Sequence, residues 1–114
     1  MKDCIFCRIA SGDVPAEIVH SDDIVVAFRD LNPKAPTHML LIPRKHVASL
    51  RELTQDDDGA VGHLMRISAQ LAEAEGISDS GFRLVANSGP DAGQSVGHLH
   101  FHLLGGRELG WPPG

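Results

Sequence analysis

Apolar and polar positions alternate most regularly near the end of the chain, over residues 97–106. In this stretch His98, His100 and His102 alternate with Leu99, Phe101 and Leu103. Successive side chains of a strand point to opposite faces, so the pattern predicts a strand with three imidazoles on one face. The apolar residues on its other face are expected to belong to the core.

Four further strands are predicted from similar, weaker alternation. They cover residues 15–20, 24–30, 37–43 and 82–87. The first two flank Ser21-Asp22-Asp23, whose composition is typical of a hairpin turn. In the third strand His38 precedes a run of alternating aliphatic residues, where a lone histidine is more often structural than functional.

Helical periodicity predicts one main helix and one short helix at the N-terminus. The main helix follows a capping-box sequence over residues 54–57 and ends near Gly76. Its apolar face is formed by Val61, Leu64, Met65, Ser68, Leu71 and Ala72. His63 lies on the other side, and we expect it to be solvated and not catalytic. The short helix ends at Gly12. These elements predict an α+β fold, a five-stranded antiparallel sheet with helix packed on one face, in a single domain over residues 1–114.

Composition excludes several classes of protein. Apolar residues make up 42% of the 114 residues, which argues against disorder, and no apolar run is long enough to span a membrane. The net charge is −5 without a cluster of lysine or arginine, so we expect no binding to nucleic acid polymers. The chain starts without a signal-peptide pattern, which predicts a cytoplasmic location.

The histidine row allows three interpretations. Three separate structural histidines are disfavoured, because imidazoles are costly to bury without partners. A single metal bound by all three is disfavoured as well, since a strand rises by ~3.3 Å per residue and the outer two side chains are too far apart. We therefore favour a division of labour in which one imidazole attacks, a neighbour stabilises the developing charge and the third has a structural role.

Two cysteines at the N-terminus indicate a metal site more than a redox centre. Cys4 and Cys7 have the spacing of half a zinc site, and no βαβ context for a thioredoxin-like pair is visible. Reduced structural thiols or a local disulfide are the alternatives. His46 and His98 could supply the other two ligands of a closed tetrahedral site.

A long loop rich in glycine and small polar residues connects the last two strands. It covers residues 87–97 and has the composition of a segment whose backbone amides can surround an anion. Taken alone, Asp30 reads as a turn or capping carboxylate. The chain ends in a proline-stiffened segment with its only tryptophan, Trp111, which would suggest a partner subunit if it were docked.

Together these segments resemble the histidine triad (HIT) family, whose signature is His-X-His-X-His-X-X with apolar X. Residues 98–104 match this signature, and the similarity extends through residues 4–7, 27–30, 35–38, 42–46 and 105–107. The ending Trp111-Pro112-Pro113-Gly114 is similar to the histidine triad nucleotide-binding (Hint) branch. Gly97 stands where the family usually carries a bulkier residue, so we expect a more mobile loop before the triad.

The resemblance implies a purine nucleoside phosphoramidase, or nucleotidyl hydrolase, acting on adenylate-amine substrates through a covalent nucleotidyl-histidine. His100 would be the nucleophile, and His38 and His102 would support proton movement and the phosphate oxygens. Asp30 would hold the ribose hydroxyls. The base would contact Phe6, Ile9, Phe28 and Leu31, the phosphate would contact Asn87, Gly93, Gln94 and Ser95, and Trp111 would reach the partner's site.

The resemblance also implies a homodimer whose sheet continues across the interface. Its ligands would be purine nucleoside monophosphates and their phosphoramidates. Family members with the cysteine pair resemble the zinc arrangement proposed above, with Cys4, Cys7, His46 and His98 as structural ligands. The alternatives are a dinucleoside polyphosphate hydrolase and a non-catalytic nucleotide-binding protein. Ser95 with His100 as its base is a second possible nucleophile.

Overall fold

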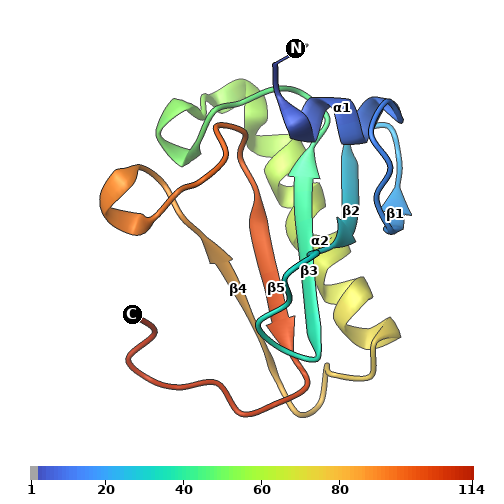
Figure 1. Ribbon diagram of the computed structural model, residues 1–114, viewed down its shortest axis with the longest axis vertical. Helices are drawn as coiled ribbons and strands as arrows, with labels where there is room; N and C mark the ends of the chain where they lie inside the picture. Colours follow the sequence, from blue (N-terminus) through green and yellow to red (C-terminus); the bar gives the residue numbers. More distant parts are fainter. Residues whose placement is uncertain (1–2) are drawn as a thin grey trace.

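The computed structural model describes residues 3–114 and contains a five-stranded antiparallel sheet in the order β1-β2-β3-β5-β4 (Figure 1). The strands are β1 (Ile18–Ser21), β2 (Val25–Arg29), β3 (Thr37–Pro43), β4 (Phe82–Ala86) and β5 (Phe101–Gly105). The helices are α1 (Ile5–Ser11) and α2 (Asp58–Ala74), with short 3-10 turns at Leu50–Glu52, Gln55–Asp57 and Pro90–Ala92. The predicted fold class, with one main helix against the sheet, is confirmed.

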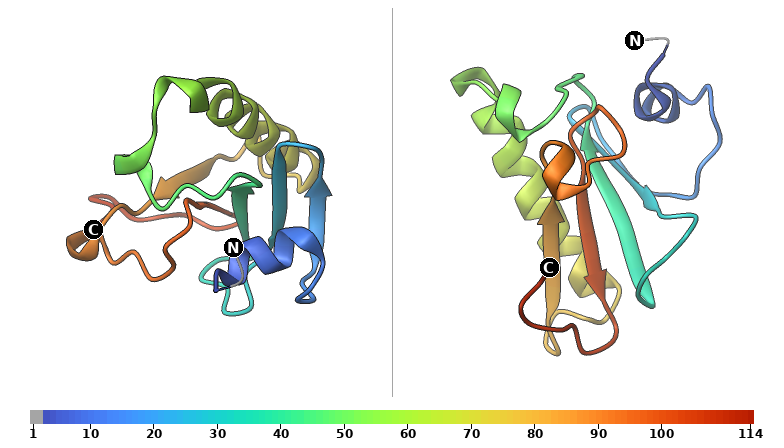
Figure 2. Two further views of the ribbon diagram at one scale, coloured as in Figure 1. Left: turned by 90° about the horizontal axis from the view of Figure 1, so that it is seen from above. Right: turned by 60° about the vertical axis from the view of Figure 1, so that its left-hand side comes forward.

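The two helices lie on opposite sides of the sheet, as Figure 2 shows. The face toward α2 carries the larger core, formed by Val25, Ala27, Met39, Leu41, Val47, Leu64, Ile67, Leu71, Leu99, Phe101 and Leu103. The face toward α1 carries a smaller cluster of Cys4, Phe6, Val26, Phe28, Leu40 and Ile42. The alternation of β2, β3 and β5 thus divides the sheet into a packed face and a face available for chemistry.

The predicted start of the main helix is confirmed, and its predicted face needs two corrections. A capping box links Thr54 and Asp57 in the 3-10 turn that leads into α2. Ile67 is buried although it was not predicted, whereas Met65 is 37% exposed. His63 is half-buried and not solvated as predicted, since its side chain is only 22% exposed and its Nε2 lies 2.7 Å from Oδ2 of Asp22. Within residues 3–114, no helix combines the length and the apolarity needed to cross a bilayer.

Strand β5 is shorter than the alternation predicts. It begins at Phe101, so His98 and His100 precede it. The backbone N–H of Leu99 donates to the carbonyl of Val47 at 2.6 Å, which takes this segment away from the ladder with β3. Strand β1 also starts later than predicted, at Ile18, and residues 15–17 belong to the connection from α1.

Candidate active site

Pairing of β3 with β5 brings the first two imidazoles together. Leu40 is opposite His102, and His38 lies two residues before Leu40 on the same face of β3. Nε2 of His38 is 2.9 Å from Nδ1 of His102. The sequence predicted His38 at the start of one strand and His102 as the last histidine of another, and the strand register makes them neighbours.

A chain of hydrogen bonds sets the proton positions on this pair. The backbone N–H of Lys34 donates to Nδ1 of His38 at 3.0 Å, so that nitrogen carries no proton. In neutral His38 the proton is then on Nε2, which donates to Nδ1 of His102. Nε2 of His102 is therefore the protonated nitrogen, ready to donate to a substrate oxygen or leaving group. Asp30 supports His38 from the side, with Oδ2 3.5 Å from its Nε2.

Burial keeps both rings of this pair neutral. It lowers the pKa of His38, an effect that the charge of Lys34 adds to and the nearby carboxylate of Asp30 opposes. Burial also lowers the pKa of His102, and its neighbours His100 and His38 act in the same direction. At neutral pH the pair is thus a set of oriented donors and acceptors without net charge.

His100 lies between this pair and α1. His100 is only 4% exposed, and its Nδ1 donates to the carbonyl of His98 at 2.8 Å. The unprotonated nitrogen is then Nε2, the form that a nucleophile requires. Among residues 3–114 Nε2 has no hydrogen-bond partner, and no buried side-chain nitrogen or oxygen there lacks one, so Nε2 reaches the surface. The ring packs edge-on against Phe6 and His102, each with a centroid distance of 5.1 Å.

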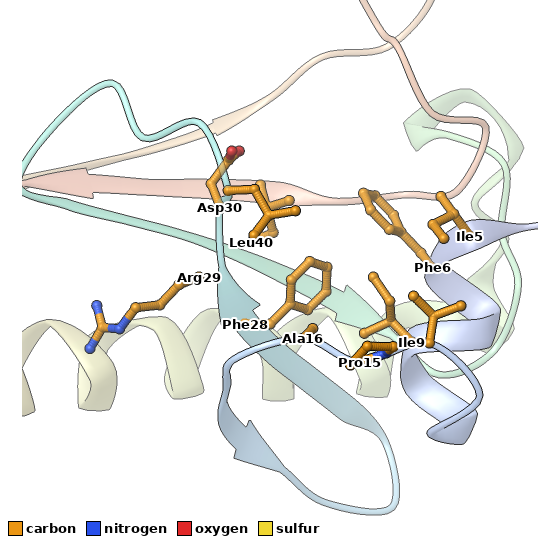
Figure 3. Close-up of a pocket in the computed structure, with 11 residues that line it drawn as sticks. Ile5, Phe6, Ile9, Pro15, Ala16, Phe28, Arg29, Asp30 and Leu40 are labelled. Atoms are coloured by element: carbon orange, nitrogen blue, oxygen red, sulfur yellow. The ribbon is translucent and has the colours of Figure 1, made fainter.

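An apolar pocket of about 250 Å³ lies next to Phe6, the residue that packs on His100 (Figure 3). Its lining includes Phe6, Ile9, Phe28, Asp30 and Leu31, the five residues predicted to contact base and ribose. Phe6 and Phe28 pack edge-to-face with ring centroids 5.5 Å apart. Leu31 is 99% exposed at the rim. The pocket therefore offers an aromatic and aliphatic wall with one carboxylate at its edge.

Sequence reasoning missed about half of this lining. The remaining residues are Ile5, Val14, Pro15, Ala16, Arg29 and Leu40. Ile5 could have been found, because it shares a helical face with Phe6 and Ile9. Pro15 and Ala16 were predicted in a strand, but they lie in the connection between α1 and β1, where they close the pocket.

A second, more polar pocket of about 390 Å³ lies on the His38 and His102 side. Asn87 lines it together with Lys34 and Arg83. Asn87 is thus brought beside the imidazoles, as its predicted phosphate role requires. Trp111 is 81% exposed, and the guanidinium of Arg83 lies 5.9 Å from its ring centroid.

The loop before the triad is organised by Gln94. Its Oε1 accepts from the N–H of Gly89 at 2.9 Å, and its Nε2 donates to the carbonyls of Ala48 and Val96 at 2.7 and 3.0 Å. Gly93 adopts a left-handed conformation at the end of the turn before it. Gln94 therefore holds the loop's shape. Exposed Ser95 lines two neighbouring hollows and not the pocket beside His102. Phosphate contacts by these three residues stay a prediction.

The four predicted metal ligands converge on one point. Their sulfur and nitrogen atoms all lie within 4.8 Å of one another, and Cys4 and Cys7 are both free thiols. Sγ of Cys4 is 3.2 Å from Nδ1 of His98, and Sγ of Cys7 is 3.3 Å from Nδ1 of His46. A tetrahedron with ligand distances of ~2.0–2.3 Å has edges of roughly 3.3–3.8 Å, close to these separations.

Hydrogen bonds with backbone groups orient two of the ligands. Nε2 of His98 donates to the carbonyl of Pro43 at 2.8 Å, so its Nδ1 presents a lone pair to the cluster. The N–H of Cys7 donates to Sγ of Cys4 at 3.3 Å. Burial lowers the pKa of His98, which also favours the neutral form that binds metal. The donor set and its orientation fit a structural zinc ion.

The antiparallel sheet, the triad and the two-pocket site together define a known class. The chain belongs to the HIT domain family, whose model matches residues 11–109. It is 47% identical to a HIT family hydrolase from Legionella pneumophila Philadelphia 1, with a TM-score of 0.97 over 98% of this chain and 100% of that one.

Two sequence relatives span nearly the whole chain. An uncharacterized HIT-like protein from Synechococcus elongatus is 48% identical over 99% of this chain and 98% of its own length. The purine nucleoside phosphoramidase of Escherichia coli (strain K12) is 42% identical over 96% of this chain and 92% of its own length.

Proposed function

We propose that this protein is a purine nucleoside phosphoramidase that releases the amine from adenylate-amine substrates such as AMP-NH2 or AMP-lysine. The similarity to the E. coli enzyme supports this activity. The observation that carries the proposal is the proton arrangement of the imidazoles, with Nε2 of His100 unprotonated and Nε2 of His102 protonated. This arrangement supplies a nucleophile and a proton donor side by side.

The proposed reaction has two steps. Nε2 of His100 attacks the phosphorus, the P–N bond breaks, and the leaving nitrogen takes the proton from Nε2 of His102, which regains one from solvent. Water then attacks the nucleotidyl-His100, the P–Nε2 bond breaks, and the proton lost from water passes to solvent by way of the same nitrogen of His102. The products are AMP and the amine. Covalent attack divides one difficult displacement into two easier ones.

Binding of the nucleotide would use both pockets. The purine would lie in the apolar pocket lined by Phe6 and Phe28, with the ribose hydroxyls at Asp30. Asn87 would donate to the phosphate from the polar pocket. Donors fixed around the phosphoryl oxygens are most stabilising in the transition state, where those oxygens gain charge.

Steady-state assays separate this proposal from its alternatives. We expect hydrolysis of an adenosine phosphoramidate with a higher kcat/KM than that of a diadenosine polyphosphate, and we expect His100→Ala to lose at least about 1,000-fold in kcat. Faster cleavage of the polyphosphate would favour a dinucleoside polyphosphate hydrolase. Binding of AMP without turnover of either compound would favour a non-catalytic nucleotide-binding protein.

We further propose that Cys4, Cys7, His46 and His98 hold a structural zinc ion that ties α1 to the sheet. The converging ligand atoms and the oriented His98 support this. Elemental analysis of the pure protein is expected to find one zinc per chain, and Cys4→Ala is expected to lose it and to unfold at lower temperature. A metal-free wild-type protein would contradict the zinc proposal alone.

We also propose a homodimer of the Hint branch, in which the sheet continues across the interface. The supporting features are that β4 is an edge strand with partly exposed residues and that Trp111 is 81% exposed near it. Sedimentation analysis is expected to give twice the chain mass, and Trp111→Ala is expected to lower kcat/KM without dissociating the dimer. A monomeric wild-type protein would contradict this assignment. The cytoplasmic location stays a prediction.

A further inference from the structure

A second group of histidines lies at the edge of the sheet that β1 forms, away from β5. His20 on β1, Asp22 in the β1–β2 turn and His63 on α2 meet at one carboxylate oxygen; we refer to these three residues as the His-Asp-His cluster. Oδ2 of Asp22 is 2.6 Å from Nε2 of His20 and 2.7 Å from Nε2 of His63. Strand β1 is separated from β5 by β2 and β3, so the cluster is not part of the triad.

The carboxylate of Asp22 is held in place independently of the histidines. Its Oδ1 accepts from the N–H groups of Ile24 and Val25, both at 2.8 Å. Although burial raises the pKa of Asp22, hydrogen bonds from His20, His63 and these two amides hold it well below its usual range. The group is thus a fixed anion with two imidazoles aimed at its second oxygen.

From this geometry we propose that the His-Asp-His cluster is a site for a divalent first-row transition metal ion. Two imidazoles and one carboxylate form a donor set that suits such ions, with further coordination positions left for water or a ligand. The three ligand atoms lie within 4.8 Å of one another, and the side chains are between 22% and 29% exposed, which leaves a path from solvent. The formal charge of the three ligands with neutral imidazoles is −1.

Binding requires small rearrangements that the structure identifies. The present separations are hydrogen bonds and are shorter than the roughly 3 Å between ligands around a metal ion. Each imidazole must move its proton from Nε2 to Nδ1, so that Nε2 can coordinate. On His63 the nitrogen Nδ1 is 2.9 Å from Nη2 of Arg66, a donor that opposes this change. The exposed Arg66 must therefore swing away, and Arg44, which donates to the carbonyl of Asp22, adds a second positive charge nearby.

Calorimetric titration with Ni²⁺ tests the proposal on the full chain equilibrated with one equivalent of Zn²⁺. We expect one Ni²⁺ site in the wild-type protein, and His63→Gln or His20→Gln should weaken it by more than the roughly 10–100-fold typical of losing a group that only orients a ligand. Asp22→Asn keeps an oxygen for the two turn amides and should weaken binding as well. Arg66→Gln is expected to tighten binding, whereas the matched control Arg51→Gln should not.

Nuclear magnetic resonance of the histidine rings gives a second readout that needs no variant. Excess Zn²⁺ should move the ring proton of His20 and of His63 from Nε2 to Nδ1. If the rings keep their protons on Nε2, or if Ni²⁺ binds wild type and His63→Gln equally, the cluster is a hydrogen-bonded brace only and the proposal is overturned. Both readouts are independent of phosphoramidate hydrolysis, which the cluster does not touch.

Discussion

Each imidazole of the candidate active site has one nitrogen held by a neighbour, which leaves the other nitrogen for its proposed role. For His38 the fixed nitrogen is held by the backbone of Lys34, and for His100 it is held by the carbonyl of His98. Backbone groups do not titrate, so the tautomers are set by the fold and stay the same through a catalytic cycle. His102 alone depends on another side chain, which makes it the group best placed to change its protonation state.

Burial of His38 makes stability depend on pH. Its folded pKa lies below the value of ~6.5 in the unfolded chain, so the unfolded state binds more protons between the two values. Stability should therefore rise with pH through this window and be lowest below the folded pKa. Urea unfolding at a series of pH values from 5 to 7.5 is expected to show a smaller rise for His38→Gln than for wild type. An identical pH dependence in the two proteins would contradict the buried, neutral state of His38.

Replacement by alanine is expected to change stability in opposite directions at two glycines near the triad, Gly97 and Gly105. Gly97 is outside the left-handed region, and an added Cβ there meets nothing within 4 Å, so Gly97→Ala should stabilise the protein by about 0.4–1 kcal/mol through the unfolded chain. At Gly105 the same Cβ would be 2.5 Å from Cδ1 of Ile77, and Gly105→Ala should cost about 1–3 kcal/mol. Chemical denaturation measures both. Equal effects would show that the local packing differs from that described.

At the scale of elements, α2 decides which face of the sheet becomes the core. The helix covers the side chains of β2, β3 and β5 that alternate with the histidine face, so the imidazoles are left on the side where only α1 packs (Figure 2). The 3.6-residue period predicted this helix but placed Met65 inside and omitted Ile67. Ile67 is three residues after Leu64 and four before Leu71, so the same period includes it, whereas Met65 lies at the edge of the buried face.

Two adjacent residues of α2 test this packing. Leu64 is 1% exposed and Met65 is 37% exposed. Leu64→Ala should cost about 2–5 kcal/mol because it leaves a cavity against the sheet. Met65→Ala should change stability by less than about 1 kcal/mol. Thermal unfolding of the two variants measures the difference, and comparable losses would place the helix in another rotation about its axis.

Across the whole molecule, the features that could be predicted are those that leave a pattern in neighbouring residues of the sequence. Alternation found the five strands, and the spacing of Cys4 and Cys7 identified a group that the fold does bring together with His46 and His98. The late start of β5 was not predictable, because it depends on a contact between Leu99 and Val47. The His-Asp-His cluster was missed for the same reason, since His63 and Asp22 are 41 residues apart and share no pattern. Contacts between single side chains that are far apart in the chain produce no periodic pattern in the sequence.

The central claim is that His100 is the nucleophile, and trapping the nucleotidyl-His100 intermediate tests it most directly. The protein would be mixed briefly with an adenosine phosphoramidate, quenched and analysed by intact mass and peptide mapping at alkaline pH, where phosphoramidate bonds to histidine survive. We predict one added adenylate, located on His100 and absent in His100→Ala. An adduct on Ser95, or rapid turnover by His100→Ala, would contradict the account.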